Sequence, residues 1–68
     1  MPFQADALSA VEATYGLLPG EVEDLEPMFR RGDSDEQIAS FIAAAQAHRM
    51  TVDQYLTAVR ILRGAFKP

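Results

Sequence analysis

His48 is the one side chain in the sequence whose ordinary pKa lies near neutrality, which makes it the first candidate for acid–base chemistry. It lies near the expected end of an alanine-rich helix, where the helix dipole favours a positively charged imidazole. No serine or carboxylate at helical spacing would form a relay with it. A chain of 68 residues also has little room for the enclosed pocket that catalysis needs. We therefore expect His48 to cap a helix, and we expect the protein not to be an enzyme.

Metal chemistry is the next class to consider. The sequence has no cysteine and a single histidine, which excludes thiolate and histidine-rich sites. Asp33 and Asp35 alternate as they do at the start of a calcium loop. Such a loop needs glycine at its sixth position and glutamate at its twelfth, where this chain has Ile38 and Ala44. We expect no metal and no cofactor.

Three basic residues could bind phosphate. Arg60, Arg63 and Lys67 fall on one side of the last predicted helix, at spacings of three and four. They could equally complement the dipole of that helix at its C-terminus. A helix-turn-helix protein would start its recognition helix with polar and basic residues, whereas "TVDQYL" is acidic and apolar. A small nucleic-acid-binding regulator that uses this basic face is therefore the alternative function.

The tripeptide Arg31-Gly32-Asp33 matches an adhesion signal, but its neighbours predict a boundary between two helices. Gly32 follows a basic last turn, the usual position of a left-handed helix cap. Ser34 and Gln37 then have the spacing of a capping box that opens the next helix.

These residues would be positioned by helices, because the apolar period is helical throughout. We expect helices over residues 4–15, 25–31 and 35–48, with one separate turn before the second. The last helix should run from the N-cap Thr51, paired with Gln54, to Ala65. The sequence predicts one all-α domain over residues 1–68, a bundle of three to four short helices with the last helix at its centre.

The last helix carries an unusually wide apolar surface. Its apolar residues sweep roughly 220° of arc, about twice the stripe of a helix that covers one core. With no disulfide or metal to stabilise so short a chain, we expect a second chain to cover part of this surface. On the preceding helix we expect Ile38, Phe41, Ile42 and Ala45 to form the core face. A row of alanines lies beside it, which could let another backbone approach closely or could reflect only the high helix propensity of alanine. The predicted partner interface consists of Ala58, Ile61, Leu62, Ala65, Ala39, Ala43 and Ala47.

The charge is distributed unevenly. Residues 1–29 contain six acids and no base, a net charge of −6, and residues 30–68 contain four acids and six bases, a net charge of +2. This asymmetry could serve helix dipoles and solubility alone, or it could create two faces of opposite sign that pair head to tail or meet a charged partner. No apolar run approaches the ~20 residues of a membrane span, and no signal peptide is visible. We expect a small cytoplasmic interaction protein of bacterial or phage origin, an adaptor, chaperone or inhibitor, acting as a homodimer and on another, unidentified protein.

Overall fold

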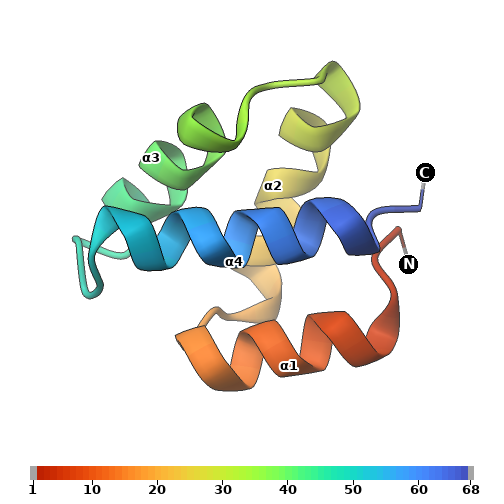
Figure 1. Ribbon diagram of the computed structural model, residues 1–68, viewed down its shortest axis with the longest axis horizontal. Coiled ribbons are helices and arrows are strands. Elements are labelled where there is room, and N and C mark those ends of the chain that lie inside the picture. Colours follow the sequence, from red (N-terminus) through yellow and green to blue (C-terminus); the bar gives the residue numbers. More distant parts are fainter. Residues whose placement is uncertain (1, 68) are drawn as a thin grey trace.

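Four helices build the part of the chain that the structure, a computed structural model, describes, which is residues 2–67 (Figure 1). They are α1 (Ala5–Tyr15), α2 (Pro19–Arg31), α3 (Asp35–Ala45) and α4 (Val52–Ala65). The described residues form no strand, only an isolated bridge between Phe3 and Phe66. The prediction of a small all-α bundle is confirmed.

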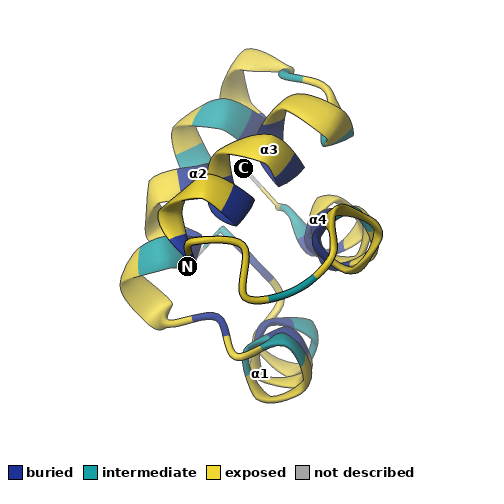
Figure 2. Cartoon of the chain, turned by 90° about the vertical axis from the view of Figure 1, so that its left-hand side faces the viewer, coloured by how far each residue is buried: buried dark blue, intermediate teal, exposed yellow. Residues whose placement is uncertain are grey.

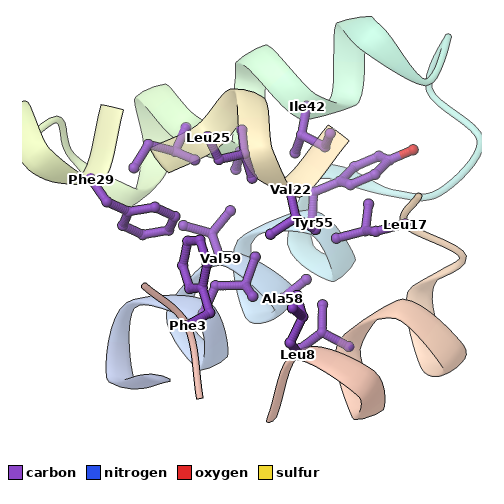
Figure 3. Close-up of a cluster of buried hydrophobic side chains, with 14 of the residues drawn as sticks. Phe3, Leu8, Leu17, Val22, Leu25, Phe29, Ile42, Tyr55, Ala58 and Val59 are labelled. Carbon is purple, nitrogen blue, oxygen red and sulfur yellow. The ribbon is translucent and has the colours of Figure 1, made fainter. Parts of the chain in front are cut away.

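α4 lies at the centre of the bundle, as predicted. It makes extensive contacts with α1 on one side and with α3 on the other. α1 and α4 run antiparallel, and the view along α4 shows α1 on one side of it and α2 and α3 on the other (Figures 1 and 2). Ala58 of α4 and Leu8 of α1 both belong to the buried core (Figure 3). A small residue such as Ala58 allows neighbouring helix axes to approach closely.

The helix boundaries follow the capping residues. Gly16 and Gly32 end α1 and α2 with φ angles of 68° and 79°, a left-handed conformation that glycine adopts without strain. The predicted cap at Gly32 is confirmed. The capping box of Ser34 with Gln37 at the start of α3 and that of Thr51 at the start of α4 are confirmed as well.

α2 is longer than predicted. It begins at Pro19 rather than near residue 25, and it continues through Pro27 without interruption. The side chain of Glu21 accepts a hydrogen bond of 2.8 Å from the backbone N–H of Leu18, which anchors the early start. Pro27 removes the N–H that would donate to the carbonyl of Glu23. Both residues are exposed, so water can satisfy that carbonyl, and the helix is maintained.

α3 is shorter than predicted and ends at Ala45. The next side chain, Gln46, turns into the core, where its Oε1 accepts a hydrogen bond of 2.8 Å from the hydroxyl of Tyr55. Its Nε2 donates to the carbonyl of Gly16 and to the carboxylate of Glu21. This network connects all four helices at one end of the bundle and fixes the point at which α3 stops.

The buried face of α3 also differs from the predicted one. Phe41 and Ala45 are exposed. The side chains that face the core are Ile38, Ala39, Ile42 and Ala43. The buried face is thus rotated toward the alanine row, where small side chains let the neighbouring helices α2 and α4 approach α3 closely.

Three phenylalanines bring the two ends of the described chain together. Phe3, Phe29 and Phe66 have ring centroids 5.4 to 5.6 Å apart. The N–H of Gln4 donates to the carbonyl of Ala65 at 2.8 Å, and the N–H of Lys67 donates to the carbonyl of Pro2. We call the pairing of residues 2–4 with residues 65–67 the terminal clasp. It holds the segment before α1 against the end of α4.

Candidate functional site

An open apolar pocket of about 220 Å³ lies between α1, α2 and the segment that precedes α1. Its floor is apolar, and three glutamates stand among its walls. The lining residues are Pro2, Phe3, Leu8, Glu12, Pro19, Val22, Glu23 and Glu26, and we call this site the acidic groove. The floor side chains Phe3, Leu8 and Val22 belong to the core (Figure 3), so the groove exposes only their edges.

The groove exists because α1 and α2 diverge. The helix pairs in extensive contact are α3 with α4, α1 with α4, and α2 with α3. α1 and α2 are not such a pair, although they are adjacent in the sequence. Core side chains fill the inner part of the space between them, and the outer part remains open. The space between them is therefore accessible from outside the bundle.

Each wall repeats one simple pattern. Leu8 and Glu12 are four residues apart on α1, and Val22 and Glu26 are four apart on α2. Pro19 and Glu23 repeat the spacing on α2. Residues four apart on a helix lie on the same face, so an apolar contact and a carboxylate are neighbours each time. The result is an apolar floor bordered by negative charge.

The charge around the groove is only partly neutralised within the chain. Glu26 pairs with Arg30 at 3.6 Å, an exposed contact. No ion pair forms at Glu12 or Glu23 among residues 2–67. Four of the six basic residues, by contrast, already lie near carboxylates: Arg30, Arg31, Arg60 and Arg63.

The predicted partner interface needs correction. Ala58, Leu62 and Ala65 of α4 are at most 3% exposed and lie in the core of the single chain. Ala39 and Ala43 of α3 are buried there too. These five residues cannot form a free surface, because α1 and α3 cover the two sides of α4.

Two members of that predicted interface do reach the surface. Ile61 is 41% exposed on α4. Ala47 is exposed but lies beyond the end of α3, so it does not continue the alanine row. The two residues therefore do not form the continuous apolar face that the sequence predicts.

The basic row on α4 is partly occupied within the chain. The Arg63 guanidinium donates to Asp35 Oδ1 at 2.5 Å and to the carbonyl of Asp33 at 2.6 Å. It also lies over the ring of Phe29, 5.2 Å from the centroid. The Arg60 Nε atom is 4.0 Å from Asp35 Oδ2, and Lys67, which lies beyond the end of α4, is exposed within the terminal clasp. Arg63 thus holds the turn before α3 against α4. Arg60 and Lys67 are the more accessible basic residues of the predicted row.

The Arg31-Gly32-Asp33 segment is folded back on itself. The Arg31 guanidinium donates to Asp33 Oδ2 at 2.6 Å. That hydrogen bond, with the charge of Asp33, raises the pKa of Arg31 above its usual value. An adhesion ligand would need both side chains extended, and here each satisfies the other.

Contrary to the prediction, His48 does not cap α3. It lies beyond the end of the helix, is exposed, and has a φ angle of 55°. Its backbone N–H, rather than its imidazole, donates to the carbonyl of Ala43 at 2.8 Å. Within residues 2–67, no three acidic or histidine side chains come together as a metal site would require. None of the described helices has the length and apolar composition needed to cross a bilayer.

The acidic groove was missed at the sequence level, although a signal for it is present. The acids of residues 1–29 indicated a negative face without locating it. The repeated apolar–glutamate spacing becomes visible only once Pro19, Val22 and Glu23 are known to share one helix. Because the second helix was expected to start near residue 25, those three residues were not assigned to a common face.

Comparisons with protein families, with curated proteins and with solved structures find no match to this chain.

Proposed function

We propose that the protein is a small, non-enzymatic interaction module that docks a segment of another protein in the acidic groove. The single observation that carries this proposal is the open apolar pocket between α1 and α2, bordered by Glu12, Glu23 and Glu26. A concave site with an apolar floor and a few charged groups around it has the usual form of a binding site.

The size of the groove favours a polypeptide over a small metabolite. Its volume of about 220 Å³ is below the ~300–1,000 Å³ of pockets that enclose most of a small ligand. A groove of this size suits one large side chain of a partner, whose remaining contacts would lie on the rim. Its lining includes no serine, threonine, cysteine, lysine or histidine beside the three glutamates, which supports binding rather than catalysis. The absence of cysteine from the sequence fits the cytoplasm, where we expect the module to act.

Site-specific photocrosslinking tests this proposal. A photoreactive phenylalanine analogue replaces Pro19, an exposed and uncharged lining residue, in one variant and Ser40, an exposed residue of α3 outside the groove, in the control. We expect discrete adducts from the Pro19 position in cells and none of the same mass from Ser40. Identical adduct patterns at the two positions, or none at Pro19, would show that the groove is not the docking site.

A further inference from the structure

We infer that the occupant of the acidic groove is a basic segment, with lysine or arginine flanking one large apolar anchor. This inference rests on the proposed function and specifies the chemistry of the partner. It follows from three features: the charge of the groove walls, the ion pairs that the basic side chains of this chain already form, and the shape of the groove floor.

The charge of the walls is the first feature. The pocket is lined by three glutamates and by no basic residue. The closest base in sequence, Arg30, pairs with Glu26 from outside the lining. Glu12 and Glu23 therefore present carboxylates beside an apolar floor, where opposite charges attract more strongly than they do in open water. A segment that brought acids to this rim would be repelled.

The bases of the chain itself are the second feature, because a second copy is the competing occupant. Arg31 is engaged by Asp33, and Arg63 by Asp35 and the carbonyl of Asp33. Docking those side chains into a neighbouring groove would first break contacts that the fold already makes. Within residues 2–67, only Arg49 and Lys67 among the lysines and arginines lack a carboxylate partner. A different, more basic segment complements the groove better than a second copy does.

The floor is the third feature. The pocket runs along α2 from Pro19 to Glu26, about 10 Å at the helical rise, and α1 bounds it on the other side. That length corresponds to about two helical turns. An apolar anchor at the centre would contact Leu8 and Val22, and bases one turn before and after it would reach the glutamates. This arrangement is an amphipathic segment laid in a groove, with its anchor giving affinity and its charges giving orientation.

A titration with defined peptides, followed by the backbone amide resonances of the ¹⁵N-labelled protein, tests the inference. The probe is an amphipathic peptide of about 12 residues with one leucine anchor flanked by lysines. Three matched peptides replace every lysine by glutamine, every lysine by glutamate, or the leucine by alanine. We expect the lysine–leucine peptide to shift the amides of Leu8, Glu12, Val22 and Glu23. We also expect it to bind more tightly than all three matched peptides.

Protein variants and salt provide the second arm. In the Glu12→Gln/Glu23→Gln variant, binding of the lysine–leucine peptide should weaken about tenfold, since two favourable charge contacts are lost. The control variant Glu36→Gln/Asp53→Gln removes two exposed acids that do not line the groove and should change the affinity less than about twofold. Raising the salt from about 20 to about 200 mM should weaken wild-type binding several-fold and affect the double groove variant much less.

The outcomes separate the inference from the proposed function. If the glutamine peptide binds the groove as tightly as the lysine peptide, the basic occupant is wrong while the groove remains a docking site. If the alanine peptide binds equally well, the anchor is wrong. If the groove amides shift with protein concentration and no peptide present, a second copy is the occupant. If the lysine–leucine peptide shifts no groove amide, the inference fails, and the photocrosslinks at Pro19 then decide the proposed function independently.

Discussion

Ala47 holds a backbone conformation that alanine rarely adopts. Its φ angle is 56°, and that of His48 is 55°. For an L-residue with a side chain, the left-handed region costs roughly 1–2 kcal/mol. The two residues adopt it because Gln46 is drawn into the core by Tyr55, so that the chain must reverse direction at once. The strain is located in an exposed turn, where a residue without a β-carbon would remove it.

Replacing Ala47 by glycine should therefore stabilise the protein. We expect Ala47→Gly to raise the free energy of unfolding by about 0.5–1 kcal/mol, the relief of strain minus the entropy that glycine adds to the unfolded chain. The same change at Ala10, exposed within α1, should lower it by about 1 kcal/mol. Urea unfolding of both variants measures the difference. Destabilisation by Ala47→Gly would mean that this turn is not left-handed.

The position of His48 was predicted incorrectly because the controlling contacts are distant in sequence. The alanine-rich stretch continues past Gln46 to Ala47, and nothing local signals a helix end after Ala45. The stop is set by the side chain of Gln46, which reaches Gly16 and Glu21, both far away along the chain. Periodicity and propensity describe neighbours, so they cannot anticipate a partner on another helix.

At the scale of helices, the start of α4 illustrates how local rules determine an element. Thr51 Oγ1 accepts a hydrogen bond of 3.2 Å from the N–H of Gln54, and the Gln54 side chain accepts one of 2.9 Å from the N–H of Thr51. All the participants lie within four residues. The sequence alone therefore located this boundary correctly.

Removing that cap should destabilise the whole domain, because α4 contacts both α1 and α3. We expect Thr51→Ala to lower the free energy of unfolding by about 1 kcal/mol. Thr57→Ala is the matched control. The hydroxyl of Thr57 only donates back to the carbonyl of Asp53 within the helix, so its loss should be neutral or slightly stabilising. Equal effects of the two substitutions in urea unfolding would contradict the capping role of Thr51.

α2 was predicted less well because one residue type gave conflicting signals. Pro27 favours a helix start, and Pro19 followed by Gly20 resembles a turn. In the folded chain Pro19 is the first residue of the helix and Pro27 is tolerated on its exposed side. Val22 and Leu25, both buried, hold the early turns of α2 in place. Core packing thus overrides the local preference, and the acidic groove depends on that outcome.

At the scale of the whole molecule, the wide apolar surface of α4 is used within the chain. The sequence indicated correctly that more of this helix is apolar than one neighbour can cover. It could not distinguish a second chain from another helix of the same chain, because both bury apolar surface in the same way. α1 and α3 both pack against α4, and Ala58 and Ala65 are buried in the core of the single chain.

A pair of glutamate substitutions tests this arrangement. Ala58 is 1% exposed, so Ala58→Glu would bury an unpaired charge and should lower the free energy of unfolding by more than about 3 kcal/mol. Ile61 is 41% exposed, and Ile61→Glu should cost about 1 kcal/mol or less and leave the molar mass in solution unchanged. Thermal unfolding and light scattering measure the two effects. A well-folded Ala58→Glu variant with half the wild-type molar mass would restore the α4 surface as a dimer interface.

The terminal clasp has a consequence for the order in which the molecule assembles. α3 and α4 are joined by a short turn, so their contact can form early from a local hairpin of helices. Pairing Phe3 with Phe66 instead closes a loop of almost the whole chain, at an entropic cost on the order of 4 kcal/mol. We therefore expect the segment before α1 to dock late in folding and to detach first in the native state. That segment and α1 form one wall of the acidic groove, so a chain in which they have not docked has no groove. A partner that binds there therefore selects completely folded molecules and slows the detachment of the segment before α1.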